Sequence, residues 1–335
     1  MRVSKALDLR GSIVVVTGAT SGVGRATALH LAECGANVVI AARRAEALDE
    51  VATLCTQMGV QALAVPTDVT SEEAVNALAA AALERFGRID AWVNNAGVTL
   101  YQLLENGPVD EHLRVIETNL FGAIYGARAA LPIFRKQGRG ILVNLGSVLS
   151  EVGQALVPAY VISKFGVRGL SEALRVEVAD EPDIHVCTVL PYAIDTPHFQ
   201  VGANRMGLQP RALPPVQSPE KVARAIAAVL ERPRRQLHVP GIARLGLLFH
   251  AIFPVATERL LLATLRRWHL SEDAEVQSAG NLYTPPPPSE PAKLHGDRPP
   301  QLSTPRLMGW LALELGKQQL SAVVHHVRSW RQARA

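Results

Sequence analysis

Tyr160 and Lys164 are the two side chains whose types and spacing first suggest chemistry. Residues four apart lie on the same face of an α-helix, so a Tyr-x-x-x-Lys sequence places the phenol beside the ammonium group. An isolated tyrosine has a pKa of about 10 and holds its proton too tightly to exchange it readily at neutral pH. A neighbouring positive charge stabilises the phenolate and lowers that pKa. The pair therefore predicts a proton donor and acceptor for the oxygen of an alcohol or carbonyl compound.

Two further polar residues precede this pair. Ser147 follows a β-branched run that we expect to be a strand, and Asn119 lies in the long helical pattern before that run. Three of the four side chains also fit ordinary structural roles: Tyr160 as a helix aromatic, Lys164 as a surface charge and Ser147 as a loop cap. Taken one at a time, they do not establish a catalytic site.

A glycine-rich segment, Thr17-Gly18-Ala19-Thr20-Ser21-Gly22-Val23-Gly24, follows the first predicted strand and leads into the helical pattern 25–34. In such a turn, glycines let the backbone pass close to a pyrophosphate, and the free N–H groups and dipole of the helix N-terminus face the anion. Glycines also serve ordinary turns that need a positive φ. The position between a strand and a helix favours the nucleotide-binding interpretation.

The second predicted strand ends at Arg43-Arg44 and carries no acidic residue there. A dinucleotide fold that selects NAD usually places an acid at this point for the ribose hydroxyls, whereas NADP requires a cation for its 2′-phosphate. Arginines at the start of a helix oppose its dipole, which favours a compensating anion, although they also fit a solvated helix start. We therefore predict NADP(H) as the cofactor, with NAD(H) less favoured.

Short β-branched runs alternate with longer helical patterns through the first 240 residues, as a parallel α/β sheet requires. Several runs are apolar throughout, as expected for strands that helices cover on both faces. Between them lie helical segments such as Ser71–Phe86 and Ser218–Arg232, the second with an N-cap serine and a proline at its first position. We predict a doubly wound α/β fold, a mostly parallel Rossmann sheet in one domain, residues 1–240, with seven strands: Ile13–Thr17, Asn37–Ala41, Ala62–Val65, Ala91–Asn94, Ile141–Leu145, Ile184–Leu190 and Gln236–Val239.

The ordered set of these motifs resembles the short-chain dehydrogenase/reductase family over about seven tenths of the chain: the TGxxxGxG turn, Asn94-Asn95-Ala96-Gly97, Asn119, Ser147 and the Tyr-x-x-x-Lys pair. The resemblance implies an oxidoreductase that moves a hydride between nicotinamide and an alcohol/carbonyl pair. It implies that Tyr160 is the acid/base, and that Lys164 lowers its pKa while bonding the nicotinamide ribose. It also implies that Ser147 holds the substrate oxygen and that Asn119 anchors a water in the proton relay.

The resemblance extends to the cofactor contacts. Asp68 and Val69 match the adenine contact, although an acid that starts a helix would look the same. Residues 95–97 match the stretch beside the adenine ribose, although asparagines here also brace a central sheet. Ile194 and Thr196 match the positions that contact the carboxamide. The predicted cofactor-binding residues are Gly18, Thr20, Ser21, Gly22, Val23, Gly24, Arg43, Asp68, Val69, Asn95, Ala96, Gly97, Tyr160, Lys164, Pro191, Ile194 and Thr196.

The chain departs from the family pattern at Tyr192. After the sixth strand the family usually reads Pro-Gly-x-x-x-Thr, and this chain reads Pro191-Tyr192-Ala193-Ile194-Asp195-Thr196. A tyrosine in place of the glycine adds bulk and restricts φ beside the nicotinamide. We expect the hydride chemistry to survive, with an altered loop geometry and substrate pocket.

Charge and cysteine content limit the function classes. The chain has 335 residues and a formal net charge of +4, and residues 1–240 hold 23 basic and 23 acidic side chains. This neutral part argues against nucleic acid as a partner. Three distant cysteines without a CxxC pair indicate reduced thiols, and the N-terminus shows no secretory signal. We expect a cytoplasmic protein without a metal site.

The composition changes in residues 241–335, a C-terminal extension with 11 basic and 7 acidic side chains. Its apolar stretches, Leu245–Ala256 and Leu260–Leu265, are too short to span a membrane. They have two interpretations: packing on the core or in an oligomer contact, or peripheral membrane contact with arginines at the headgroups. A Pro-rich segment, Tyr283–Pro300, is expected to be extended and poorly ordered, and a basic helix is predicted from about Arg306 to the end.

Substrate-facing residues are expected in the variable loop from His198 to about Pro215. The loop contains Phe199, Met206 and Leu208 and little charge, which favours a hydrophobic carbonyl or alcohol substrate. The resemblance also implies a homo-oligomer. Two other functions stay open: a non-catalytic NADP-binding scaffold or sensor, which the intact catalytic motifs weigh against, and a membrane-associated lipid ketone reductase.

Overall fold

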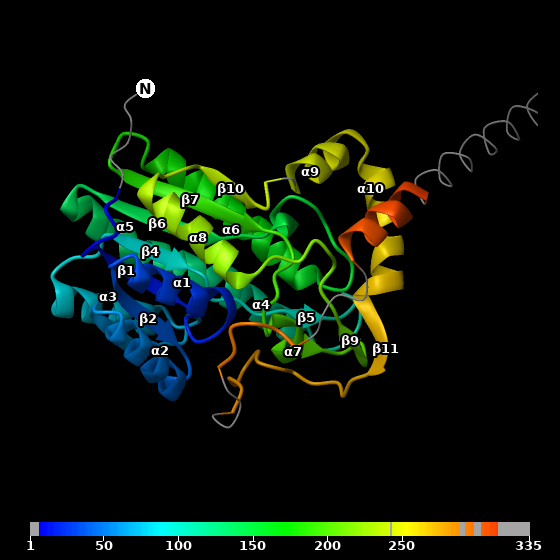
Figure 1. Ribbon diagram of the computed structural model, residues 1–335, viewed down its shortest axis with the longest axis horizontal. Helices are drawn as coiled ribbons and strands as arrows, with labels where there is room; N and C mark the ends of the chain where they lie inside the picture. Colours follow the sequence, from blue (N-terminus) through cyan, green and yellow to red (C-terminus); the bar gives the residue numbers. More distant parts are fainter. Residues whose placement is uncertain (1–6, 242, 288–291, 298–302, 314–335) are drawn as a thin grey trace, which may run out of the picture.

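A computed structural model describes residues 7–241, 243–287, 292–297 and 303–313. Its centre is a parallel seven-stranded sheet with the order β10-β7-β6-β4-β1-β2-β3 (Figure 1). The predicted α/β class and all seven predicted strands are confirmed, with ends that differ by one residue at most. The strands are β1 Ile13–Thr17, β2 Asn37–Ala42, β3 Ala62–Pro66, β4 Ala91–Asn94, β6 Gly140–Leu145, β7 Ile184–Pro191 and β10 Gln236–Val239.

The strand order reverses between β1 and β4, which pair in parallel with Val14 opposite Ala91. From β1 the chain winds outward through β2 and β3, and it then returns to β4 and winds the other way. Loops that leave the carboxyl ends of β1 and β4 therefore diverge, and they open a crevice at this edge of the sheet. Both strands are fully buried, as their apolar sequences predict.

Two helical layers cover the sheet and explain its burial on both faces. The apolar stripes of α1, α2 and α8 share one core cluster with the sheet, and those of α3, α5 and α6 share the other. The predicted helix starts have physical caps: Ser71 Oγ accepts from Ala74 N at the start of α3, and Ser218 Oγ accepts from Lys221 N at the start of α8. The helices are α1 Gly22–Glu33, α2 Ala45–Gln57, α3 Glu72–Phe86, α5 Gly122–Gln137, α6 Pro158–Glu177 and α8 Pro219–Glu231.

A buried polar network joins the carboxyl ends of β4 and β6 to the helices beside them. Asn94 Nδ2 donates to Asn144 Oδ1 at 2.9 Å and to the Ala123 carbonyl at 3.0 Å, and Trp92 Nε1 donates to Asn94 Oδ1 at 2.8 Å. Asn144 Nδ2 then donates to Ser171 Oγ at 2.9 Å. Every polar group of this network has a partner, so it fixes α5 and α6 against the sheet at little desolvation cost.

The C-terminal extension packs against the carboxyl edge of the core and includes two short helices at one end of the sheet (Figure 1). Its strand β11 pairs antiparallel with β9, from the loop after β7. The described part of the Pro-rich segment contacts the core, which the composition did not predict: Gly22 N donates to the Lys293 carbonyl at 3.1 Å. The elements are α9 Ala243–Ile252, α10 Pro254–Thr264, the π-helical turn η3 Leu265–His269, β9 Leu208–Pro210 and β11 Leu270–Ala274.

The predicted terminal helix is described only in its first part. Residues 304–313 are helical, starting close to the expected position at Arg306, and residues 314–335 lie outside the described part of the chain. The remaining short elements belong to the loops at the carboxyl edge: β5 Leu100–Tyr101, α4 Val109–Ile116, the π-helical turn η1 Glu117–Phe121, the 3₁₀ turn η2 Val148–Ser150, α7 His198–Val201 and β8 Ala203–Asn204.

Gly126 in α5 tests the buried amide network. A Cβ there would lie 2.0 Å from Asn94 Oδ1 and 2.7 Å from Trp92 Nε1, so Gly126→Ala must displace the amide from its partners. We expect the free energy of unfolding, measured by urea denaturation, to fall by about 1–3 kcal/mol. Gly169→Ala on the exposed surface of α6 is the matched control, because nothing lies within 4 Å of its added Cβ. The control is expected to match or exceed the parent, and equal losses in both variants would contradict this account.

Candidate active site

The turn after β1 brings backbone segments so close together that two of its glycines have no room for a side chain. Gly18 has φ +67°, and a Cβ there would lie 2.8 Å from Ala96 Cα. A Cβ on Gly24 would lie 2.1 Å from the Gly18 carbonyl oxygen. The Asn95 side-chain amide donates to the carbonyls of Thr17, at 2.7 Å, and Gly18, at 3.2 Å. These contacts fix the turn against the end of β4 and aim the N-terminus of α1 at the crevice.

One cavity of about 560 Å³ runs along the crevice. Every site residue predicted from the sequence lines it except Asn119. The nucleotide-binding turn and the Tyr-Lys pair therefore face the same space, which is within the usual size range of ligand pockets. Among the described residues, no group of three or more His, Cys, Asp or Glu side chains forms a candidate metal site.

Ser147, Tyr160 and Lys164 come together at the end of β6. Ser147 caps η2 by accepting from Leu149 N at 3.1 Å, and its side chain interacts with the Tyr160 phenol so as to lower the pKa of that phenol. Tyr160 and Lys164 share one face of α6, with Lys164 Nζ 5.5 Å from the centroid of the phenol ring. Lys164 Nζ also donates to the Leu145 carbonyl at 2.7 Å. The ammonium group is thus held between the strand end and the tyrosine.

Burial dominates the protonation of this pair. It raises the pKa of Tyr160 to about 12, against the lowering effect of the Ser147 side chain. It lowers the pKa of Lys164 to about 8. Removal from water thus shifts the pKa of each group in the direction of its neutral form. The role of Lys164 in lowering the pKa of the phenol during reaction stays a prediction.

Asn119 lies behind the cavity, in η1. Its Oδ1 accepts from Val98 N at 2.8 Å, and its Nδ2 donates to the Val98 carbonyl and to Ser163 Oγ, both at 3.0 Å. Ser163 Oγ in turn donates to the Tyr160 carbonyl at 2.7 Å. Both N–H groups of the amide are thus used within the protein, and the water that we expect Asn119 to anchor stays a prediction. The side chain ties the loop after β4 to the turn of α6 that carries Tyr160.

Two aromatic residues beside the Tyr-Lys pair shape the cavity. Tyr192, in place of the family's glycine, lines it without a left-handed backbone, so the restriction on φ carries no strain. His198 lies edge-on to the Tyr160 ring, with 5.7 Å between centroids. Burial and the nearby Lys164 lower the pKa of His198 to about 4, so the imidazole is neutral at physiological pH. The sequence placed His198 only at the start of a variable loop, and no spacing signalled this contact.

The substrate end of the cavity differs from the prediction. Phe199 lines it, but Met206 and Leu208 do not. Leu208 instead pairs with Ala274 in the ladder between β9 and β11. The extension contributes Leu261, from α10, to the cavity wall. This residue was missed because sequence patterns do not show which distant helix covers a loop.

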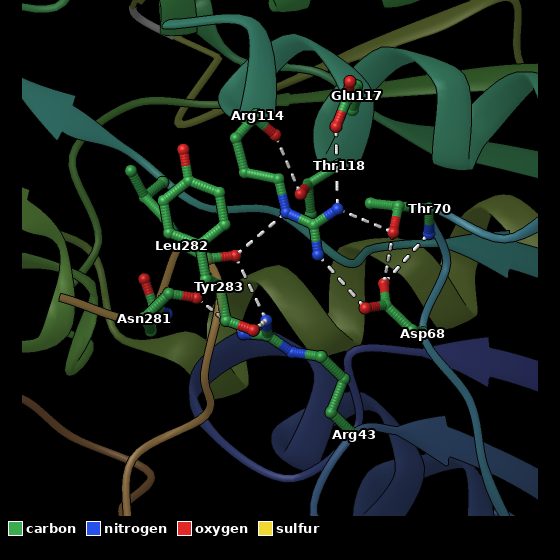
Figure 2. A network of polar contacts seen from close by, with 9 residues as sticks. All are labelled: Arg43, Asp68, Thr70, Arg114, Glu117, Thr118, Asn281, Leu282 and Tyr283. Carbon is green, nitrogen blue, oxygen red and sulfur yellow. Dashed lines mark hydrogen bonds and ion pairs between the residues drawn. The ribbon is translucent and has the colours of Figure 1, made fainter. Parts of the chain in front are cut away.

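The opposite end of the cavity is a network of arginines and main-chain carbonyls (Figure 2). Arg43 donates to the carbonyls of residues 281, 282 and 283, at 2.6, 3.2 and 3.0 Å. Arg114 Nη2 lies 3.1 Å from Asp68 Oδ2, and its Nη1 donates to Thr70 Oγ1 at 2.8 Å. Although burial acts in the opposite direction, hydrogen bonds from Thr70 and the charges of Arg114 and Arg43 hold the pKa of Asp68 below its ordinary value.

Comparison with known proteins agrees with this geometry. The family model described as short chain dehydrogenase matches residues 12–205, more than half of the chain. The chain belongs to the short-chain dehydrogenase family. It is an oxidoreductase of a class that acts on CH–OH groups with a nicotinamide dinucleotide as hydride carrier.

Similar proteins support the same assignment. Uncharacterized oxidoreductase YxnA of Bacillus subtilis is 36% identical over 262 residues, which cover 77% of this chain and 73% of YxnA. Uncharacterized oxidoreductase Lmo0432 of Listeria monocytogenes is 33% identical over 231 residues, which cover 68% of this chain and 93% of Lmo0432. An alcohol dehydrogenase from Thermococcus sibiricus, solved in complex with 5-hydroxy-NADP, is 27% identical with a TM-score of 0.60, covering 68% of this chain and 95% of its own.

The lowered pKa of Lys164 predicts how carbonyl reduction by this dehydrogenase depends on pH. The ammonium form is present below about pH 8 and is lost above it, whereas Tyr160 keeps its proton up to about pH 12. We expect kcat/KM for reduction to be level below about pH 8 and to fall about tenfold for each further pH unit. Cofactor affinity measured at each pH separates this effect from binding. If kcat/KM stayed level up to pH 10, the expected fall above pH 8 could not be assigned to Lys164.

Proposed function

We propose that this dehydrogenase is an NADP(H)-dependent enzyme that interconverts a carbonyl and a primary or secondary alcohol on a hydrophobic substrate. The observation that carries the proposal is that one cavity joins the nucleotide-binding turn to Ser147, Tyr160 and Lys164. A non-catalytic scaffold on the same fold has no requirement for a buried lysine beside a buried phenol. Keeping both groups out of water is costly, and catalysis supplies a reason for it.

The proposed mechanism assigns one task to each side chain. Ser147 Oγ accepts from Leu149 N, so its own proton is available to a substrate oxygen or to the phenol. Tyr160 gives that oxygen a proton during reduction, and charged Lys164 stabilises the phenolate that forms. Bound cofactor supplies the hydride. Burial of Tyr160 and Lys164 excludes water from the reacting atoms and strengthens their electrostatic coupling.

NADP(H) is proposed over NAD(H) because of the charges at the adenosine end. No acidic residue stands at the end of β2, and Arg43 and Arg114 lie there together. Asp68 is occupied by Arg114 and Thr70, so it does not offer a free carboxylate to ribose hydroxyls. The Thermococcus sibiricus relative was solved with an NADP analogue, which supports the same choice.

A hydrophobic substrate is proposed from the side chains beyond Tyr160. Apolar and aromatic residues dominate this part of the cavity wall: Val148, Leu149, Val152, Val157, Tyr192, Phe199, Leu213 and Leu261. Burial of an apolar substrate against them contributes about 25 cal/mol for each Å² removed from water. The polar side chains that also line the cavity near Tyr160 include His198, whose pKa of about 4 leaves it neutral at physiological pH.

Titration with NADPH and NADH, followed by nicotinamide fluorescence, tests the proposal. We expect NADPH to bind at least tenfold more tightly than NADH. Tyr160→Phe is expected to retain that binding and to lose carbonyl reduction by a factor of about 100 or more, because only the proton donor is removed. Tighter NADH binding would refute the cofactor choice alone. Unchanged reduction in Tyr160→Phe would refute the proton-donor assignment, and binding without turnover of any carbonyl would favour the scaffold.

Peripheral membrane contact is a second proposal, favoured by the surface of α9 and α10. Five apolar side chains there are each more than half exposed: Leu245, Leu248, Ile252, Phe253 and Val255. Four arginines of the same segment are also exposed: Arg244 in α9, Arg259 in α10, and Arg266 and Arg267 in η3. The five apolar side chains, here called the tip, suit the interface of an anionic bilayer when basic residues lie on the same segment. Among the described helices, none is long and apolar enough to cross a membrane.

Flotation with vesicles that contain phosphatidylserine tests this contact. We expect the full-length protein to bind such vesicles, and Leu248→Glu/Phe253→Glu to weaken binding at least tenfold while NADPH affinity is unchanged. Val276→Glu is the matched control, because that side chain is 85% exposed and lies outside the tip. If the double variant instead dissociates an oligomer in solution, the tip is a subunit contact and the membrane proposal fails.

We also propose that the protein is a homo-oligomer, because the family resemblance implies one. We propose the cytoplasm as its location, because its cysteines are free.

A further inference from the structure

A segment of the C-terminal extension, residues 281–287 and 292–297, lies along the cavity and is here called the strap. Its first end is held by main-chain bonds to two arginines of the core (Figure 2). Arg43 donates to three successive strap carbonyls, and Arg114 Nε donates to the Leu282 carbonyl at 3.2 Å. Charge-assisted hydrogen bonds of this kind are about twice as strong as neutral ones.

Tyr283 adds side-chain contacts at this end of the strap. Its ring lies beside the Arg114 guanidinium, with 5.8 Å from Cζ to the ring centroid. Its hydroxyl donates to Asp110 Oδ2 at 3.0 Å, at the start of α4. Tyr283 therefore bridges two residues of α4 that lie four positions apart, and it holds the strap against the adenosine end of the cavity.

The second end of the strap is held beside the residues predicted to contact the carboxamide. His295 Nδ1 lies 3.1 Å from Asp195 Oδ2, and its Nε2 lies 2.8 Å from Glu220 Oε1. The Gly296 N–H donates to Asp195 Oδ1 at 3.2 Å. Neutral imidazole has one N–H, so bonds to both carboxylates need the protonated ring. His295 thus joins the loop after β7 to the start of α8.

The strap forms a wall of the cavity and does not fill it. Pro285, Pro286, Lys293 and His295 line the same space of about 560 Å³ as the nucleotide-binding turn and the catalytic residues. At the N-terminus of α1, the Gly22 N–H donates a hydrogen bond to the Lys293 carbonyl of the strap. The described strap residues therefore line the same cavity as the nucleotide-binding turn and contact the core directly at Gly22.

We propose that the strap is part of the cofactor site, a wall that encloses bound NADP(H) along its length, so that cofactor leaves only when the strap opens. This inference rests on the proposed cofactor. Arg43 then has a role beyond reading a 2′-phosphate, since it anchors the wall. Tyr283 and His295 are positioning residues, because they hold the wall in place and take no part in hydride transfer.

Dissociation of NADPH from the full-length protein, measured by stopped-flow displacement, tests the proposal. We expect Tyr283→Ala and His295→Gln each to accelerate dissociation several-fold, and the double variant to accelerate it roughly tenfold or more, because both ends of the wall are released. His30→Gln is the matched control: His30 also pairs with a carboxylate, Glu33, at 3.2 Å, but it lies on the outer surface of α1 and does not line the cavity. The control is expected to release NADPH at the parent rate.

The pH dependence of the release rate gives a second readout. Although burial acts in the opposite direction, hydrogen bonds to Asp195 and Glu220 and their charges raise the pKa of His295. The double bridge is present below that raised pKa and is lost as the pH rises through it. Lys293 and Asp297, which form an ion pair, are charged groups on the same segment. We expect the rate ratio of His295→Gln to the parent to be largest near pH 6 and to approach one at high pH.

The outcomes separate the wall from the cofactor. NADPH should also slow amide hydrogen exchange in the strap, and it should do so less in the double variant. Faster release with slowed exchange supports the wall. Parent-like release in the double variant, with NADPH still bound, would overturn the wall and leave the cofactor proposal standing. Tighter NADPH binding in the double variant would show that the strap competes with the cofactor. Failure of the parent to bind NADPH would overturn both.

Discussion

The close approach of β1 and β4 at the point where the strand order reverses is the constraint on which the site depends. It is possible because Gly18 and Gly24 carry no side chain, and it is held by the Asn95 amide between the two strand ends. From there a continuous path of hydrogen bonds reaches α6, which carries Tyr160 and Lys164. Val98, three residues after Asn95, is bonded twice to Asn119, which bonds Ser163, which bonds the Tyr160 carbonyl. Displacing the turn would therefore displace the tyrosine.

Burial sets the chemistry at the end of that path. A phenol with a pKa of about 12 and an ammonium group with a pKa of about 8 are both stabilised in their neutral forms by the loss of water. The same low dielectric strengthens the electrostatic interactions of any charge that forms in the cavity during reaction. Lys164 is held by the Leu145 carbonyl, so its position does not depend on the state of Tyr160. The fold thus holds a phenol and an amine in fixed positions, although burial moves the pKa of each away from its ordinary value.

The sequence predicted the features that are encoded locally. The seven strands follow from runs of β-branched residues, and the Tyr-Lys pair follows from the helical repeat, because both need only near neighbours in the chain. Features that depend on distant segments were not predictable from such patterns. Arg43 is hydrogen-bonded to three carbonyls that lie between 238 and 240 positions further along the chain. His295 is hydrogen-bonded to Asp195, which lies 100 positions before it. Leu208 was expected to face the substrate, but a ladder with the extension takes it instead. A pattern reports which face of an element is apolar and does not identify what covers it.

The Pro-rich segment shows that composition can also fail to predict contacts with the core. Its composition is poor in the apolar side chains that would predict packing, yet the carbonyls of Tyr283 and Lys293 are hydrogen-bonded to the core. Carbonyls are present in every sequence, so composition does not reveal such contacts. The partners that capture them are arginines and a free N–H at a helix start, the groups that a dinucleotide fold uses for phosphate oxygens. A surface built to bind an anion therefore also suits a strand of carbonyls, which explains how a C-terminal extension of this composition comes to lie along the nucleotide cavity.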